Sequence, residues 1–244
     1  EAVIAAHPEI TTISIVHNET TSGLINDLVS VSEVVKNRKL RFIVDAMSSF
    51  GAVDVNVAEL GIDFLISSAN KCIQGVPGFS FIIARREALT ATHGNARTIS
   101  LDLHSQWKTM EKDHGKWRFT SPTHVVAAFA QALKELQQEG GVTVRGERYA
   151  ATNRKLREGM CALGFEPFVS EAFLGPIITT FLYPEGRNLD FKHMHHWLKE
   201  QGYVIYPGKL TDRDTFRIGN IGEIYDADAD RILELFAQYT KEFM

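Results

Sequence analysis

The chain has 244 residues, of which 44% are hydrophobic and 23% charged, a composition typical of globular proteins. Its formal net charge of −4 provides no electrostatic basis for binding nucleic acid. It also lacks an apolar run of the roughly 20 residues that a membrane-spanning helix requires. Its two cysteines, Cys72 and Cys161, lie far apart and form no paired motif, which predicts free thiols and a reducing, cytoplasmic location.

The first half of the chain alternates predicted strands and helices. β-Branched and apolar runs predict strands over residues 10–16, 40–44, 64–68 and 79–84. After the first strand, Asp27 can cap a helix whose apolar residues recur at helical spacing. A short helix is expected over 56–60, residues 100–121 show little regularity, and Pro122 suits the first turn of a helix that ends at Gly140. This alternation predicts an α/β fold with a mostly parallel sheet and helices on both faces.

The second half of the chain has a different order of elements. A long charged helix over 143–163 precedes a strand, a helix capped by Asp190, two short strands and an amphipathic helix, at residues 176–183, 190–201, 203–206, 215–218 and 228–243. We therefore predict two domains: residues 1–140 as the C-terminal part of a large domain, and 141–244 as a small α+β domain. Residues 1–7 read like the end of a helix, so we expect an N-terminal part of the large domain to precede them.

A lysine and a carboxylate follow two of the predicted strands. Lys71 comes shortly after the strand 64–68 and precedes a glycine- and proline-containing turn, which makes its amine a candidate for covalent chemistry. Asp45 ends the preceding strand, 26 residues earlier. Because strand ends in one open sheet face one crevice, we expect the two side chains to share a site. Each has a simpler interpretation when taken alone, Lys71 as a surface lysine and Asp45 as a strand-end cap.

The residue types at the strand ends match the requirements of pyridoxal phosphate. This cofactor needs a lysine that binds it covalently and a carboxylate that keeps its pyridine nitrogen protonated, because the protonated ring accepts electrons from a carbanion. It also needs a hydroxyl for its ring oxygen and an apolar group over its face. These four roles could be filled by Lys71, Asp45, Thr20 and Met47.

Four motifs resemble those of the class V aminotransferases, which are pyridoxal-phosphate enzymes of fold type I. They are VDAMSSFG at 44–51, LISSANKCIQGVPG at 65–78, HGKWRFTSPTH at 114–124 and FRIG at 216–219. The resemblance covers essentially the whole chain and implies the fold-type I architecture. Within the family, the motifs look most like those of members that transfer the amino group of 2-aminoethylphosphonate to pyruvate, with phosphonoacetaldehyde and alanine as products.

The resemblance implies a role for each residue around the cofactor ring. Lys71 would bind the cofactor and then act as general base, and Asp45 would pair with the pyridinium nitrogen. Thr20 would donate to the ring hydroxyl oxygen, and Met47 would pack against the ring.

The resemblance also implies residues around the phosphate and the substrate. Ser68 and Asn70 would lie near the phosphate or the lysine nitrogen, and Thr120 would reach the phosphate of the partner subunit in a homodimer. Arg217 would bind the acidic group of the substrate, because a guanidinium fork suits both a carboxylate and a phosphonate. A second phosphate-binding segment and a stacking aromatic are expected in the part of the large domain that precedes residue 1.

Several alternatives remain open at the level of the sequence. The enzyme could instead transfer amino groups between alanine or serine and glyoxylate, or the chain could be a non-catalytic fragment without a complete cofactor site. Arg217 could simply pair with Asp212 or Asp214. We expect Cys72 to be a packed thiol. The histidines at positions 193, 195 and 196 lack a zinc pattern, so no metal site is expected.

Overall fold

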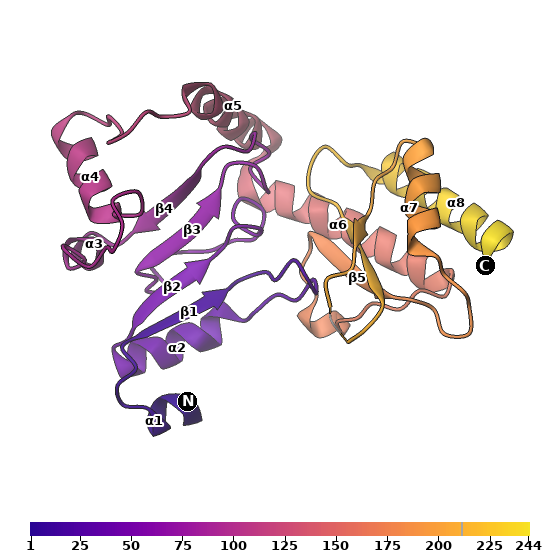
Figure 1. Cartoon of the computed structure of the whole chain (residues 1–244), viewed down its shortest axis with the longest axis horizontal. Helices are drawn as coiled ribbons and strands as arrows, with labels where there is room; N and C mark the ends of the chain where they lie inside the picture. Colours follow the sequence, from indigo (N-terminus) through magenta and orange to yellow (C-terminus); the bar gives the residue numbers. More distant parts are fainter. Residues whose placement is uncertain (211) are drawn as a thin grey trace.

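The computed structural model describes residues 1–210 and 212–244, which form two regions with a sheet in each (Figure 1). The first region contains α1 (Ala2–Ala6), β1 (Thr12–Val16), α2 (Leu28–Arg38), β2 (Arg41–Asp45), β3 (Phe64–Ser68), β4 (Ser80–Ala84), α3 (Arg86–Thr90), α4 (Leu103–Lys112) and α5 (Thr123–Glu139). The second contains α6 (Gly141–Ala162), the 3₁₀-helix η1 (Glu171–Phe173), β5 (Ile178–Leu182), α7 (Phe191–Glu200), β6 (Tyr206–Pro207), β7 (Thr215–Gly219) and α8 (Asp226–Phe243). Helix α6 begins beside the first sheet and extends into the second region.

The first sheet has the strand order β1-β2-β3-β4. Strands β1, β2 and β3 are parallel, whereas β4 runs antiparallel to β3. In this register Val16 lies opposite Asp45, and Asp45 lies opposite Ile66. The carboxyl ends of the three parallel strands therefore lie along one edge of the sheet.

Helices cover both faces of the first sheet, because successive side chains of a strand point to opposite faces. Phe42 and Val44 pack in one buried cluster with Val35 of α2. Ile43, between them, packs in another cluster with Leu89 of α3 and with residues of α4. The mostly parallel sheet with helices on both faces therefore agrees with the arrangement predicted from the sequence.

The second sheet is antiparallel, with the order β5-β7-β6. Its core is built around Phe216 of β7, whose ring is fully buried. The ring centroids of Phe165, Phe181 and Phe236 lie 5.5, 5.7 and 6.0 Å from that of Phe216. Helices α6 and α8 contribute further buried side chains to this cluster, so the second region has a hydrophobic core of its own. The predicted domain division between residues 140 and 141 stays a prediction.

Several predicted elements differ from those in the structure. Residues 56–60 form turns instead of a helix: Leu60 N–H donates to Asn56 O, and Gly61 follows at once with a positive φ of 64°. The next amides do not continue the helical pattern, because Gly61 N–H donates to Ala58 O and Ile62 N–H donates to Val57 O. In contrast, the segment judged irregular contains α4, which begins where the Asp102 carboxylate accepts a hydrogen bond of 2.8 Å from Ser105 N–H. The strand expected over 203–206 is reduced to β6.

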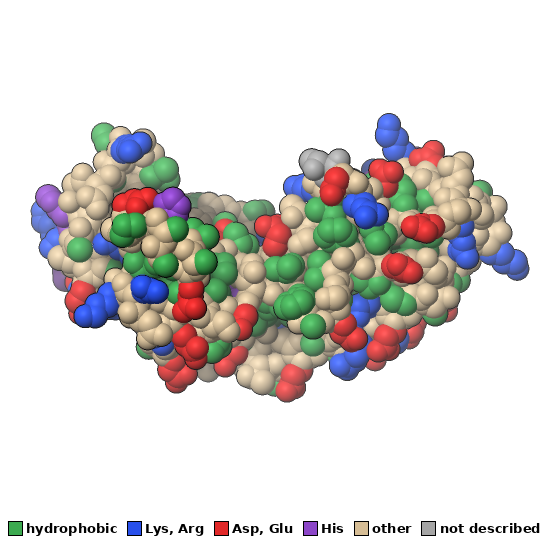
Figure 2. All heavy atoms as spheres, turned by 90° about the horizontal axis from the view of Figure 1, so that it is seen from below, with side chains coloured by type: hydrophobic (Ala, Val, Ile, Leu, Met, Phe, Trp, Pro, Cys, Tyr) green, Lys and Arg blue, Asp and Glu red, His purple; other side chains and the backbone are tan. Residues whose placement is uncertain are grey.

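The surface is mixed in character. On the face shown in Figure 2, acidic and basic side chains are interspersed, and hydrophobic side chains reach the surface between them. Among the described residues, no helix has the combination of length and apolar character that crossing a membrane would require.

The N-terminal cap of α7 provides a test of the local structure. The Asp190 carboxylate accepts hydrogen bonds from Lys192 N–H at 2.9 Å and His193 N–H at 3.2 Å, as the sequence predicted. We expect Asp190→Ala to lower the free energy of unfolding of this region by about 1 kcal/mol, because both donors lose their acceptor. Asp190→Asn should change it by only a few tenths of a kcal/mol, since an amide oxygen also caps. Urea denaturation followed by circular dichroism measures both, and equal losses for the two variants would contradict the capping role.

Candidate active site

The edge formed by the ends of β1, β2 and β3 continues beyond the strands through backbone hydrogen bonds. His17 N–H donates to Asp45 O at 2.7 Å, and Ala46 N–H donates to Ile66 O at 2.9 Å. The segments that follow the three strands are therefore held side by side. This arrangement brings the loop that contains Thr20, the turn after Asp45 and the turn that contains Lys71 to one edge of the sheet.

Asp45 is half-buried at the end of β2. One of its carboxylate oxygens, Oδ1, accepts a hydrogen bond of 2.9 Å from Met47 N–H, which holds the carboxylate in place and sets Met47 directly beside it. The backbone then turns back, because Phe50 N–H donates to Ala46 O at 3.0 Å. The second carboxylate oxygen of Asp45 takes no part in these bonds.

Lys71 lies on a tight turn after β3. Lys71 O accepts a hydrogen bond of 2.7 Å from Gln74 N–H, and Ala69 O accepts one of 2.9 Å from Gly75 N–H. A Cβ atom at position 75 would lie 2.6 Å from Ala69 O, so the turn requires glycine there. The backbone around Lys71 is thus closely defined.

Cys72, the neighbour of Lys71, fixes this turn to the turn after β2. Its side chain is fully buried, and its thiol donates to Ser48 O at 3.0 Å. Burial raises the pKa of this thiol to about 12. The thiol stays protonated at neutral pH and is a packed group instead of a nucleophile.

Arg217 lies on β7 in the second region and reaches back to the first. Its Nη1 donates to Thr20 O at 2.9 Å, and its Nε donates to Pro207 O at 3.0 Å. Only 6% of the residue is exposed, and this burial lowers the pKa of its guanidinium. Among the described residues, Arg217 forms no ion pair with Asp212 or Asp214, and its Nη2 group makes no hydrogen bond.

The loop after β1 joins the two regions at this point. Gly175 N–H donates to Gly23 O at 2.8 Å, and Thr180 Oγ1 donates to Thr21 O at 3.1 Å. A Cβ atom at Gly23, where φ is +87°, would lie 2.7 Å from Ile178 O, so glycine permits this close approach. The same loop therefore places Thr20 next to Arg217.

The structure brings most of the predicted site residues together. Thr20, Asp45, Met47, Ser68, Asn70 and Lys71 all lie in or just after the ends of β1, β2 and β3, and Arg217 contacts the Thr20 backbone. Thr120 is different, because it is exposed in the segment between α4 and α5. In the part of the chain that the structure describes, no hydrogen bond joins Thr120 to Lys71.

Sequence reasoning missed a buried polar pair at the same edge. Nδ1 of His17 lies 2.9 Å from Ser49 Oγ, and both side chains are buried. Burial lowers the pKa of His17 to about 4, so its imidazole is neutral at physiological pH. The position of His17 immediately after a predicted strand was the available signal.

Two buried oxygen atoms at this edge lack a hydrogen-bond partner among the described residues. They are Ser68 Oγ and Asn18 Oδ1. Asn18 Oδ1 packs against Gly175, whereas Ser68 Oγ ends β3; because a buried polar atom without a partner is costly, Ser68 Oγ indicates a polar ligand at this edge. Together with the Lys71 amine and the Asp45 carboxylate, the Ser68 hydroxyl forms a set of groups that fits pyridoxal phosphate.

Comparison with known proteins agrees with this arrangement. The model of the family described as "Aminotransferase class-V" matches residues 1–209. The chain is 54% identical over 99% of its length to a 2-aminoethylphosphonate–pyruvate transaminase from Klebsiella pneumoniae subsp. pneumoniae, of which it covers 66%. It is 53% identical over 98% of its length to one from Bacillus cereus, of which it covers 65%. The chain thus spans less than two thirds of the length of these relatives.

Solved structures show the same fold at lower sequence identity. An alanine–glyoxylate aminotransferase from Nostoc sp. has a TM-score of 0.85 at 21% identity, with 97% of this chain and 63% of that chain covered. A ureidoglycine–glyoxylate aminotransferase from Bacillus subtilis has a TM-score of 0.85 at 23% identity, with 98% and 63% covered. The fold class predicted from the sequence is confirmed by these similarities. The family match and the high identity to the curated relatives show that the chain belongs to the class V aminotransferases.

Proposed function

We propose that this protein is a pyridoxal-phosphate-dependent enzyme that transfers the amino group of 2-aminoethylphosphonate to pyruvate, with phosphonoacetaldehyde and L-alanine as products. The main support for this chemistry is that two adjacent parallel strands place Asp45 and the Lys71 turn at one edge of the sheet. The choice of substrates is supported by relatives at 53% to 56% identity that carry this activity in their names.

The cofactor, when bound, would supply a protonated ring that accepts the electrons of a broken C–H bond. Lys71 Nζ would hold the cofactor until the amino donor replaces it. The freed amine would then take a proton from the substrate carbon that bears the nitrogen, as a general base. The short turn between Ala69 and Gly75 supports this role, because it limits the positions that Nζ can reach.

The charge of Asp45 would stabilise the protonated pyridine nitrogen. Its Oδ1 is already used by Met47 N–H, so the other oxygen is the one that would face the ring. Ser68 Oγ would gain a hydrogen bond to the cofactor or to water held with it.

Arg217 would bind the acidic group of both substrates, the phosphonate of the amino donor and the carboxylate of pyruvate. Its Nε and Nη1 are anchored to backbone carbonyls, which fixes the plane of the guanidinium and leaves Nη2 for the acidic group. One arginine would thus serve both halves of the reaction.

We also propose a homodimer in which Thr120 serves the cofactor phosphate of the partner subunit. This is supported by the exposure of Thr120 and of the neighbouring Phe119, 56% of which is open to solvent. A hydroxyl and an exposed aromatic side by side suit a contact that combines polar and apolar interactions.

The first test is the absorption spectrum of the purified protein with pyridoxal phosphate. We expect a visible band from lysine-bound cofactor, absent in Lys71→Ala and present in Lys134→Ala, whose exposed lysine lies on α5. Adding 2-aminoethylphosphonate alone should bleach the band. A band that only alanine bleaches would favour alanine–glyoxylate transamination. The absence of any band would mean that the chain lacks a complete cofactor site.

Asp45→Asn tests the charge of the carboxylate separately from its shape. The amide oxygen can still accept from Met47 N–H, whereas the charge opposite the ring nitrogen is lost. We expect the rate of the first half-reaction to fall about 100-fold or more, the loss typical of a group that stabilises developing charge. Single-turnover bleaching of the cofactor band measures this rate. A rate within a factor of two of the unsubstituted protein would rule out the pairing.

Arg217→Lys tests whether one arginine binds both acidic groups. Lysine keeps the charge but loses the planar fork, so we expect KM to rise for 2-aminoethylphosphonate and for pyruvate together. Steady-state kinetics with each substrate varied in turn measures both constants. If only one KM rises, another residue binds the second substrate.

A further inference from the structure

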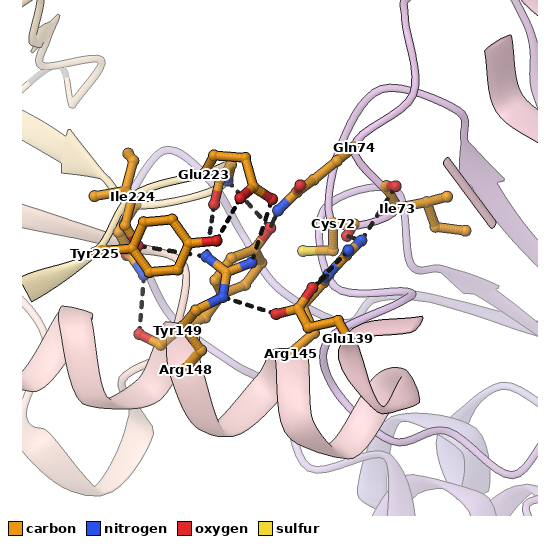
Figure 3. Close-up of polar contacts among 12 residues, drawn as sticks. Cys72, Ile73, Gln74, Glu139, Arg145, Arg148, Tyr149, Glu223, Ile224 and Tyr225 are labelled. Atoms are coloured by element: carbon orange, nitrogen blue, oxygen red, sulfur yellow. Dashed lines mark hydrogen bonds and ion pairs between the residues drawn. The ribbon is translucent and has the colours of Figure 1, made fainter. Parts of the chain in front are cut away.

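A largely buried ionic cluster lies between the two regions (Figure 3). Glu139, the last residue of α5, accepts hydrogen bonds from two arginines of α6, Arg145 and Arg148, whose Nε atoms each lie 2.7 Å from a Glu139 oxygen. The Arg145 side chain is only 1% exposed and that of Arg148 only 15%. Burial alone would raise the pKa of Glu139, but the hydrogen bonds from Arg148 and Arg145 lower it below its ordinary value. The carboxylate is therefore ionised between the two cations.

Arg145 connects this cluster to the turn that contains Lys71. Its Nη1 donates to Cys72 O at 3.0 Å and to Ile73 O at 3.2 Å, the two carbonyls that directly follow Lys71. Since the donor is buried and charged, these bonds are of the strong type. They hold the backbone on the carboxyl side of Lys71 through a helix that belongs to the second region.

Arg148 connects the same cluster to the segment that follows β7. Its Nη1 donates to Gly222 O at 2.8 Å and to Ile224 O at 3.4 Å. This segment begins directly after the strand that carries Arg217. Glu139 is thus shared by one arginine that holds the Lys71 turn and another that holds the extension of the Arg217 strand.

Tyr149 makes a second link between the same two segments. Its hydroxyl oxygen accepts hydrogen bonds from the Gln74 side-chain amide and, at 3.1 Å, from Gly222 N–H. In Figure 3, Gln74 approaches from the Lys71 turn and Glu223 and Tyr225 from the opposite side, with Arg148 and Tyr149 between them on α6. The Glu139–arginine cluster and Tyr149 therefore each connect the Lys71 turn to the loop after β7.

We propose that Glu139, Arg145, Arg148 and Tyr149 form a positioning unit that sets the separation between Lys71 and Arg217. The inference rests on the proposed function and deepens it, because it names residues that align the proton-transferring amine with the group that binds the substrate's acid. None of the four touches the reacting atoms. They act on the backbone at either side of the site, and an error of about 1 Å in such a separation can reduce the rate about 100-fold.

Hydrogen–deuterium exchange of the cofactor-free protein tests the unit without any reference to activity. The reporters are the amides of Gln74 and Gly75 in the Lys71 turn and of Gly222 in the loop. In Arg145→Met we expect exchange at Gln74 and Gly75 to rise about tenfold, because the turn loses a charged donor. Arg145→Lys, which keeps a cation beside Glu139 but lacks the fork, should produce a smaller rise and serves if the methionine variant does not fold.

Coupling between the two arginines is tested by Arg148→Met, because the Arg148 side chain hydrogen-bonds to Glu139, Gly222 and Ile224 and, among the described residues, makes no hydrogen bond to the turn. We expect faster exchange at Gly222 and also at Gln74 and Gly75, because Glu139 loses one of its two partners. The matched control is Arg85→Met, which removes a partner of the buried Asp63 beside the opposite ends of the strands. It should leave all three amides unchanged. If Arg148→Met changes the exchange of Gly222 alone, the two arginines act separately, and the proposal of one positioning unit is wrong.

With cofactor and substrates, Arg145→Met should lower kcat about 10- to 100-fold, with a smaller change in KM, because alignment is affected more than binding. Arg85→Met should leave both constants near those of the unsubstituted protein. An unchanged kcat beside increased exchange would show that the cluster only stabilises the fold. Since the exchange measurement needs neither cofactor nor substrate, a failure of the proposed reaction is distinguishable from a failure of this inference.

Discussion

The structure depends on the parallel register of β1, β2 and β3. Because these strands run in the same direction, their carboxyl ends share one edge, and the segments that follow them are joined by further backbone hydrogen bonds. This register brings Asp45 and the Lys71 turn to the same edge. An antiparallel arrangement of β2 and β3 would have sent them to opposite edges of the sheet.

In the proposed function, the second region supplies Arg217 to the site. Its guanidinium is buried against the Thr20 backbone, and the loop after β1 is in turn bound to the start of β5. Because the site lies between the two cores, it can combine residues that are almost 200 positions apart in the sequence, here Thr20 and Arg217. Under the proposed function, the relative placement of the two regions also affects the chemistry, and the polar cluster at the junction is the feature we propose to control it.

Burial and pairing determine which titratable groups around the site are neutral and which are charged. The thiol of Cys72 and the imidazole of His17 are both kept neutral, since burial raises the pKa of the first and lowers that of the second. The guanidinium of Arg217 keeps its charge even with a lowered pKa, because arginine starts far above neutrality. Glu139 stays ionised through its two arginines.

The sequence alone was sufficient to predict the mostly parallel sheet, the helices on both faces, the caps at Asp27 and Asp190 and the family, because these follow from local periodicity, capping chemistry and contiguous motifs. It also predicted that Asp45 and Lys71 would share an edge. It failed for residues 56–60 and for α4, where short-range signals compete and tertiary packing decides. It could not show that Arg145 and Arg148 hold the Lys71 turn and the loop after β7, since residues of a charged helix look solvent-exposed until their partners are known. Only the tertiary structure determined which charges are buried, because burial and pairing depend on segments brought together from distant parts of the chain.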